Sequence, residues 1–353
     1  MKLCVWSDLH LGRTLYRTNQ GELNRFEKIG YDTFDRYIDE ILKENPDILV
    51  NLGDTFETSN PSIIALNKFS LGMTRLKDVP QIVILGNHDY NHKNRAEKCS
   101  ATETILKTTD ANVIEFADYE YKTYEEDDCL FILVPYIYSD KNSIATMWNE
   151  IREIVDANYG KKKIIMLTHG VTEQYANNFI GFENEHIKVP SSILEKCNLC
   201  LIGHIHKPLD YKVKGCRVIS PGAMIDWAEY EDETGLLIVD TKTLNVTKHK
   251  ISTVHSYSFD CDESNINDIL GTVDENIYRI NYVGDTAVID NNKFVTAKNT
   301  AVNLVLNIQR FSAEEDLNST TEQKDIKNFF GWIEDNYPDK LSTFMEAKDQ
   351  CVS

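Results

Sequence analysis

Five short polar blocks, each directly after a predicted buried strand, constrain this chain more than any other feature. In chain order they occupy residues 8–10 (DLH), 53–54 (GD), 86–89 (GNHD), 169–170 (HG) and 203–206 (GHIH). The apolar runs before them predict strands over 2–6, 48–52, 81–85, 163–168 and 199–202, separated by helix-like segments. Such alternation indicates βαβ units around a buried sheet, whose sites assemble beyond the carboxyl ends of the strands. The sequence therefore predicts one site built from all five blocks.

The side chains of these blocks form a mixed pool of oxygen and nitrogen ligands. Residues two apart at a strand end point the same way, so a carboxylate and an imidazole, or two imidazoles, can bind one cation together. This pool suits manganese or iron, whereas a structural zinc site favours thiolate. Alone, the first two blocks are ordinary turns and the lone histidine of the fourth is more often structural, whereas the third and above all the fifth are more specific. The ordered set of five carries the prediction. The predicted metal ligands are Asp8, His10, Asp54, Asn87, His169, His204 and His206.

Two metal ions about 3.5–4 Å apart can activate water and neutralise a phosphate group. We expect one ion on Asp8, His10, Asp54 and His206, and a second on Asp54, Asn87, His169 and His204, with Asp54 bridging. Two further residues are predicted to be catalytic. His88 is expected to donate a proton to the leaving oxygen. Asp89 is expected to orient that imidazole, with a turn-capping role as the alternative.

The charge balance restricts the partners. The chain carries 37 basic and 56 acidic residues, a net charge of −19, which argues against a protein that coats nucleic acid non-specifically. Any DNA contact is therefore local, and an ordinary solvated side chain is the alternative at each candidate position. No apolar run reaches the roughly 20 residues of a membrane helix, and the N-terminus is unlike a signal peptide, so we expect a cytoplasmic protein without a membrane partner. The candidate DNA contacts are Arg13, Arg17, Arg25, His92, Lys93, Arg95 and Lys98.

The pattern of apolar residues predicts five regions. The site belongs to residues 1–251, and the polar, acidic stretch 252–276 is expected to be a linker. Residues 277–311 are predicted to form a small α+β unit, 312–321 a second linker and 322–353 a helical segment. The helices expected over 23–44 and 94–108 could each supply a homodimer interface, and the sequence does not choose between them.

Taken in order, the five blocks resemble the calcineurin-like metallophosphoesterase superfamily over about residues 1–250. This resemblance implies an α/β fold, a two-sheet β-sandwich flanked by helices. The segments 7–13 (SDLHLGR), 53–61 (GDTFETSNP), 203–208 (GHIHKP) and 220–222 (SPG) further resemble the SbcD-type nuclease subunit of DNA repair and recombination complexes, including phage-encoded relatives. Some family members carry a second histidine three residues after the bridging Asp, and Glu57 occupies that position here.

The narrower resemblance implies a manganese-dependent DNA exonuclease and endonuclease, with magnesium or iron as alternative metals. Its implied roles are in DNA repair, recombination and replication, on double-stranded ends and single strands, beside an SbcC-type coiled-coil ATPase. Residues 277–311 would be the DNA-capping domain and 322–353 the ATPase-binding segment. A phage-encoded protein would work in the host cytoplasm.

Two alternatives remain. A phosphoesterase acting on a small phosphodiester or a phosphoprotein would use the same site, but residues 55–58 (TFET) lack the Arg of protein serine/threonine phosphatases, and a small esterase would not need the chain after 251. A catalytically silent scaffold for the ATPase is disfavoured because all seven predicted ligands and His88 are present.

Overall fold

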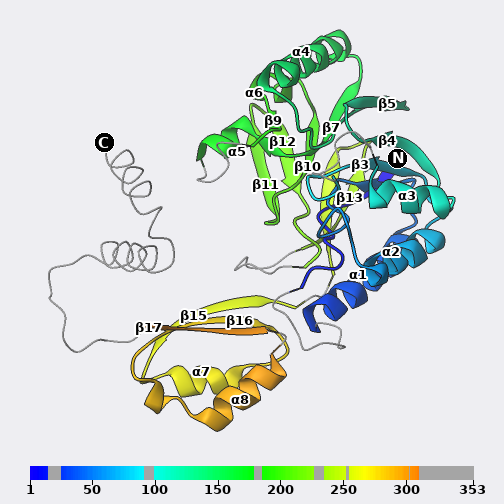
Figure 1. Ribbon diagram of the computed structural model, residues 1–353. Coiled ribbons are helices and arrows are strands. Elements are labelled where there is room, and N and C mark those ends of the chain that lie inside the picture. Colours follow the sequence, from blue (N-terminus) through cyan, green and yellow to red (C-terminus); the bar gives the residue numbers. More distant parts are fainter. Residues whose placement is uncertain are drawn as a thin grey trace, which may run out of the picture.

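Two six-stranded sheets packed face to face form the larger part of the protein (Figure 1). The computed structural model describes residues 1–14, 25–90, 99–178, 185–225, 234–251, 254–301 and 303–309. The first sheet has the order β14-β13-β1-β2-β3-β4, in which β1 to β4 are parallel and β13 and β14 are antiparallel to their neighbours. Its strands are β1 (Lys2–Trp6), β2 (Ile48–Asn51), β3 (Gln81–Ile84), β4 (Val113–Ala117), β13 (Gly235–Asp240) and β14 (Asn245–Lys250).

The second sheet has the order β11-β12-β10-β7-β6-β5, with a parallel centre of β6, β7, β10 and β12. Antiparallel strands β5 and β11 close its two edges. A separate two-stranded ribbon joins β8 (Val171–Thr172) to β9 (Lys188–Val189). The strands of the second sheet are β5 (Lys122–Glu126), β6 (Cys129–Val134), β7 (Lys163–His169), β10 (Leu199–Gly203), β11 (Leu209–Val213) and β12 (Cys216–Ser220).

The core between the sheets consists of strand side chains that point inward. Val5 and Val50 of the first sheet pack with Phe131, Leu167 and Leu201 of the second, and all five are fully or almost fully buried. Burial of such a side chain contributes roughly 1.5–3 kcal/mol to the free energy of unfolding. This central layer fixes the two sheets against each other and thereby brings their strand ends together.

Helices cover the outer face of each sheet. On the outer face of the first sheet, Phe34 and Ile38 of α1 pack with Trp6 and Leu49. On the outer face of the second sheet, Trp148 of α4 packs with side chains of the strands. The expected α/β two-sheet sandwich flanked by helices is therefore confirmed. Residues 94–98, the start of the helix expected over 94–108, lie outside the described residues. The helices are α1 (Arg25–Glu44), α2 (Ile63–Arg75), α3 (Ala101–Thr108), α4 (Lys141–Asn158), α5 (Glu173–Asn178) and α6 (Ser191–Leu194).

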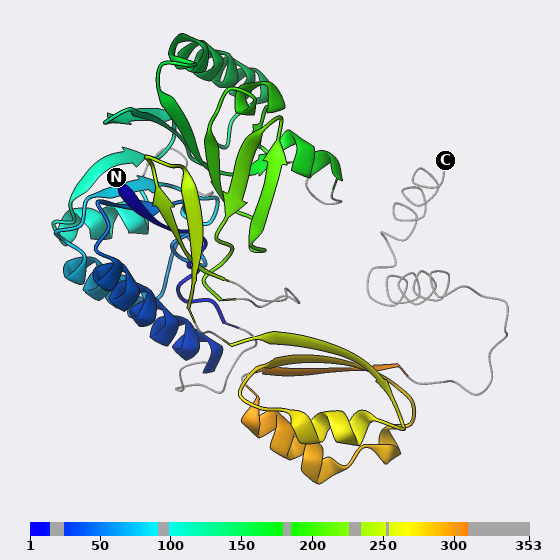
Figure 2. The same cartoon turned by 180° about the vertical axis from the view of Figure 1, so that it is seen from behind.

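A smaller unit follows the sandwich, with a parallel sheet of order β15-β16-β17. Parallel neighbours need crossover connections, which α7 and α8 supply. Both helices lie on the face of the small sheet turned away from the sandwich (Figures 1 and 2). The elements are β15 (Ser256–Asp262), α7 (Ile266–Thr272), β16 (Ile277–Val283), the 3-10 turn η1 (Thr286–Val288), α8 (Asn291–Thr300) and β17 (Asn303–Gln309).

This unit corrects two expectations. Residues 252–276 are not merely a linker, because β15 and α7 lie within them, and the unit is an α/β βαβαβ arrangement rather than α+β. The open face of the sheet explains the error: Asn281 donates to Asp260, and Asn307 donates to Asn281, each at 2.8 Å. Polar residues on that face make β15 look like a polar connection. The expected linker 312–321 and helical segment 322–353 lie outside the described residues.

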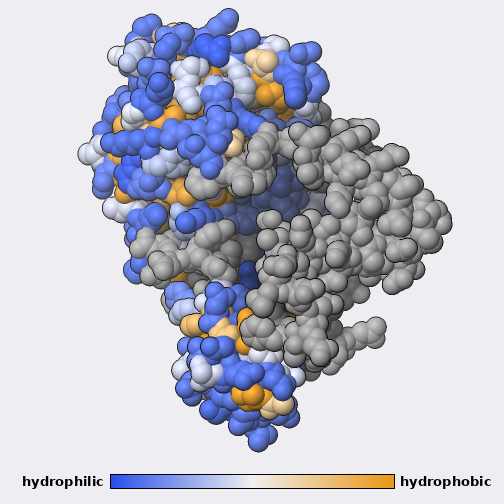
Figure 3. Space-filling view, turned by 90° about the vertical axis from the view of Figure 1, so that its left-hand side faces the viewer, coloured by the Kyte–Doolittle hydropathy of each residue, from blue (hydrophilic) through white to orange (hydrophobic). Residues whose placement is uncertain are grey.

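On the face shown in Figure 3, the described surface is mainly hydrophilic, with small hydrophobic patches. Among the helices of the described ranges, none is long and apolar enough to cross a membrane.

Candidate metal centre

The structure brings all seven predicted ligands to the carboxyl ends of adjacent strands. In the first sheet, Asp8 and His10 follow β1, Asp54 follows β2, and Asn87 follows β3. In the second sheet, neighbouring strands β7 and β10 deliver His169, His204 and His206. The centre therefore forms where the strand ends of the two sheets meet.

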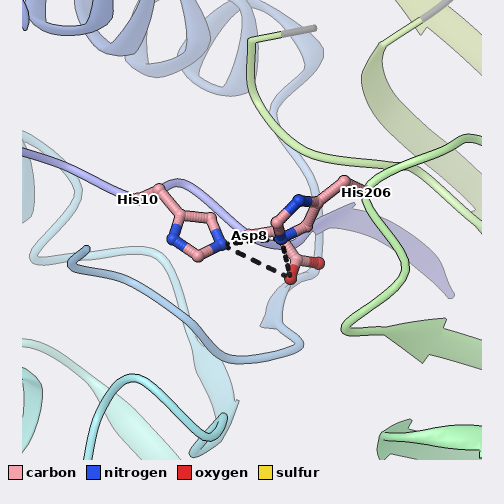
Figure 4. A group of neighbouring side chains, drawn as sticks. All are labelled: Asp8, His10 and His206. Atoms are coloured by element: carbon pink, nitrogen blue, oxygen red, sulfur yellow. Dashed lines mark hydrogen bonds and ion pairs between the residues drawn. The ribbon is translucent and has the colours of Figure 1, made fainter. Parts of the chain in front are cut away.

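The first group of donors consists of Asp8, His10 and His206. Figure 4 shows the two imidazole rings next to each other, each with one nitrogen joined by a dashed line to the Asp8 carboxylate. Their Nε2 atoms are 3.0 Å apart, and each lies 3.9 Å from Asp8 Oδ1. These ligand atoms lie close enough together to hold one metal ion.

The second group contains Asn87, His169 and His204 around Asp54. Asn87 Oδ1 lies 3.1 Å from His169 Nε2 and 2.8 Å from His204 Nδ1. Asp54 Oδ2 is 3.3 Å from the same His169 nitrogen. Asp54, His169 and His204 also place ligand atoms within the reach of a single ion.

Asp54 stands between the two groups. Its Oδ2 atom is 3.7 Å from His10 Nε2 on one side and 3.3 Å from His169 Nε2 on the other. Its second oxygen, Oδ1, accepts the main-chain N–H of His88 at 2.8 Å. One carboxylate oxygen of Asp54 is thus adjacent to both groups.

The donor spacing fits bound divalent cations. Two ligands about 2.1 Å from an ion and at right angles to each other are roughly 3 Å apart, and His10–His206, His169–Asn87 and His204–Asn87 have this spacing. The donors are carboxylate, amide and imidazole groups without thiolate, all of which are known ligands of divalent cations.

Backbone conformation distinguishes four of the ligand residues. Asp8, His10, Asp54 and His204 have φ angles of 51°, 45°, 54° and 84°. Residues other than glycine rarely adopt this left-handed region, and such strain persists only where the surrounding structure imposes it. The loops impose it through main-chain hydrogen bonds, in which Asp8 donates to Gly53 and His10 donates to Asp54, both at 3.0 Å.

Close packing between the loops explains two glycines of the blocks. A Cβ atom on Gly53, whose φ is +98°, would lie 2.6 Å from the Gly86 nitrogen and 2.7 Å from His169 Nδ1. A Cβ atom on Gly86 would lie 2.6 Å from His169 Cε1. Larger residues at either position would therefore push the loops of the centre apart.

Electrostatics couples the buried ligands. Burial lowers the pKa of His169, but the charge and hydrogen bond of Asp54, the charge of Asp8 and the Leu52 main-chain oxygen together outweigh burial and raise that pKa to about 9. Burial alone would raise the pKa of Asp54, but the neighbouring His169 holds that pKa below its usual range. Burial and the neighbouring His10 lower the pKa of His206 to about 2, so its imidazole stays neutral and available to a cation.

The two predicted catalytic residues have different surroundings. His88 lies beside the first group: its ring centroid is 4.8 Å from that of His10, and its Nδ1 donates to the main-chain oxygen of Glu57 at 2.6 Å. The Asp89 carboxylate instead accepts the main-chain N–H groups of Asp54, Thr55 and Gly86 at 2.8, 3.3 and 2.9 Å. These contacts favour the turn-organising alternative for Asp89 over a role in orienting His88.

Only one side chain among the predicted DNA contacts lies in the described part of the protein. Arg13 Nη1 is 3.4 Å from Glu57 Oε2, next to His10. The main chain of Arg25 begins α1, but its side chain is outside the described residues. The same holds for the whole of Arg17, His92, Lys93, Arg95 and Lys98.

Two acidic residues beside the centre were not predicted. Glu57 Oε2 lies 2.8 Å from His10 Nδ1, and Glu185 Oε1 lies 3.3 Å from His204 Nε2. Glu57 follows Asp54 by three residues, which is a usable signal. Glu185 lies in a loop 19 positions before His204, and no sequence pattern links the two.

A two-sheet α/β sandwich that gathers Asp, Asn and His ligands at its strand ends defines a metal-dependent phosphoesterase. The family model for calcineurin-like phosphoesterases matches residues 1–208, and the chain belongs to that family. The family acts through divalent metal ions, and the clusters described above are candidate sites for them.

Within this family, the chain is similar to individual DNA-repair proteins. The chain is 27% identical over 212 residues to the DNA double-strand break repair protein Mre11 of Methanococcus maripaludis, a match that covers 59% of this chain and 52% of that protein. It is 22% identical over 311 residues to the SbcD component of the nuclease SbcCD of Staphylococcus saprophyticus, covering 80% and 77%. The chain spans about half the length of the archaeal relatives it matches. Its resemblance to the SbcD and Mre11 type of nuclease is confirmed at this modest identity.

Among solved structures, a dimetal phosphatase from Danio rerio is similar with a TM-score of 0.47 and 12% identity. The match covers 67% of this chain and 91% of that one.

Proposed function

We propose that the protein is the manganese-dependent DNA nuclease subunit, exonuclease and endonuclease, of an SbcCD-type repair and recombination complex. The observation that carries the proposal is the position of Asp54 Oδ2, 3.7 Å from His10 Nε2 and 3.3 Å from His169 Nε2. A carboxylate oxygen between two clusters of donors is what a centre of two ions requires.

The ligand sets follow from the two groups. Asp8, His10 and His206 would hold one ion, and Asn87, His169 and His204 the other, with Asp54 shared between them. When bound, the two ions would neutralise the phosphate and activate water. His88 would donate a proton to the leaving oxygen, since its ring lies beside the first group. Manganese is the metal proposed, with magnesium and iron as alternatives.

DNA as substrate is supported by the names of the relatives, one a double-strand break repair protein and one a nuclease component. Double-stranded ends and single strands are the proposed forms. We assign the DNA-capping role to the small unit around β15, β16 and β17. The proposed place of action is the cytoplasm, which would be the host's for a phage protein. Arg13 contacts Glu57, which in turn contacts His10, and we assign this arginine to a bound phosphate.

The proposed partner is an SbcC-type coiled-coil ATPase, bound through residues 322–353. The name of the staphylococcal relative, a component of SbcCD, supports this proposal. Deleting residues 322–353 should abolish co-purification with the co-expressed ATPase while leaving metal binding unchanged. Intact binding after the deletion would contradict the docking assignment.

The nuclease assay uses linear duplex DNA with manganese or with magnesium, in parallel with a His88→Ala variant and with bis-p-nitrophenyl phosphate as a generic phosphodiester. We expect manganese-dependent cleavage of the DNA well above the variant's background. The DNA assignment would be falsified if the generic diester were hydrolysed and the DNA were not. Hydrolysis of neither compound would contradict catalysis as such and favour the scaffold alternative.

A further inference from the structure

In three of the proposed ligand histidines, an oxygen atom contacts the ring nitrogen that points away from the metal centre. His169 Nδ1 lies 2.6 Å from the main-chain oxygen of Leu52, while the rings of His10 and His204 each contact a glutamate. Carbonyl and carboxylate oxygens only accept hydrogen bonds, so the contacted ring nitrogen carries the proton. In the neutral form of each ring, the opposite nitrogen then presents its lone pair to the centre.

Glu57 is fixed next to His10 by the main chain. Its own N–H donates to the Leu11 oxygen at 3.1 Å, and an isolated bridge pairs Leu11 with Phe56. Its carboxylate lies 2.8 Å from His10 Nδ1, on the far side of the ring from Asp8 and His206. The ring of His10 therefore has its Nε2 directed at the first group of donors.

Glu185 holds His204 in a similar way. Tyr136 Oη donates to Glu185 Oε2 at 2.9 Å, and the other oxygen lies 3.3 Å from His204 Nε2. His204 Nδ1 consequently faces Asn87 Oδ1 at 2.8 Å, in the second group. Both glutamate side chains are largely buried, with 28% and 18% of their surface exposed. In each group of donors, one glutamate thus contacts the ring nitrogen of one histidine on the side away from the centre.

We propose that Glu57 and Glu185 are positioning residues of the metal centre, each holding one histidine in the tautomer and orientation that one ion requires. The inference rests on the proposed function, because it takes His10 and His204 as ligands of different ions. A carboxylate behind a ligand histidine raises the basicity of the ring and fixes its direction, and its removal costs about 10- to 100-fold in metal affinity.

The test titrates manganese into the metal-free full-length protein and follows the heat of binding, with electron paramagnetic resonance to detect coupled manganese pairs. Glu57→Ala and Glu185→Ala should each weaken a different one of the two binding steps, by about 10- to 100-fold. Glu57→Gln and Glu185→Gln should recover most of the loss, because the amide oxygen can still accept the proton of the same ring nitrogen. Glu40→Ala is the matched control, since Glu40 Oε2 contacts His249 Nε2 at 3.2 Å away from the centre, and should leave both steps unchanged.

The outcomes separate the two proposals. A wild-type protein that binds fewer than two ions overturns the proposed function, and the inference with it. Two ions bound at wild-type affinity by both alanine variants overturn the inference alone. Equal loss of both ions, together with a lower unfolding temperature of the metal-free variant, would indicate a merely structural role and also overturn it. Binding of a third ion that is lost in Glu57→Ala would also overturn the inference, because His10, Glu57 and His88 would then be the ligands of that ion.

Discussion

The carboxylate of Asp89 accepts the main-chain N–H of Asp54 at 2.8 Å, which fastens the loop after β3 to the loop after β2. The same side chain accepts the N–H of Gly86 and the hydroxyl of Thr102, at 2.9 and 3.0 Å. Burial, together with the nearby charge of Asp54, raises the pKa of Asp89 to about 6. The loops that carry Asp54 and Asn87 therefore share one buried acceptor.

Asp89→Ala should destabilise the protein, because several buried donors would lose their acceptor. Each unsatisfied buried group costs about 1–3 kcal/mol, so we expect the free energy of unfolding to fall by about 3 kcal/mol or more. Urea denaturation of the metal-free protein measures the change. Asp140→Ala is the control: Asp140 also accepts main-chain N–H groups, from Asn142 and Ser143, but in contact with water. Equal losses in the two variants would contradict the role of Asp89.

The sequence predicts those residues of the centre that are marked by their own neighbours along the chain. Asp54 and His169 follow short apolar strands, and the residue types show what they bind, so the ligand blocks could be read from the chain. The contact between Glu185 and His204 depends on a loop returning to the second sheet, which no spacing encodes. Strand β15 was misread because Asp260 and Ser258, on its open face, resemble the residues of a polar linker.

Asp54→Asn should abolish the stabilisation that manganese gives the protein. A ligand at about 100 times its dissociation constant stabilises the native state by about 2.7 kcal/mol. The wild type should therefore unfold at a higher temperature with manganese, whereas the variant, which lacks the shared carboxylate, should not. Asp110→Asn is the matched control, because Asp110 has a similar φ of 49° in an exposed turn. A full manganese-induced shift in Asp54→Asn would contradict the shared role.

The metal-free protein should lose stability as the pH rises toward 9. His169 has a pKa of about 9 in the folded protein, where Asp54, Asp8 and the Leu52 main-chain oxygen together outweigh burial, against about 6.5 when unfolded. The folded state thus holds this proton more tightly. Its stabilising contribution is fully present below pH 6.5 and is lost as the pH rises through about 9. Urea denaturation from pH 6 to 9.5 in the presence of chelator should show a steeper decline for the wild type than for His169→Gln, and parallel curves would contradict the assignment.

Replacement of His88 should affect substrates according to how strongly their leaving oxygen needs a proton. The ring lies beside His10, and its Nδ1 donates to the Glu57 main-chain oxygen, so Nε2 is the nitrogen that would donate to the leaving oxygen. Loss of a general acid typically costs about 10²- to 10⁴-fold in rate. His88→Gln should therefore slow DNA cleavage by about that factor. It should slow hydrolysis of bis-p-nitrophenyl phosphate much less, since p-nitrophenolate leaves without a proton. His249→Gln, on β14 where the ring contacts Glu40 and Glu44 away from the centre, is the control and should change neither rate. An equal loss on both substrates, with two ions still bound, would show that His88 stabilises the phosphate instead of protonating the leaving oxygen.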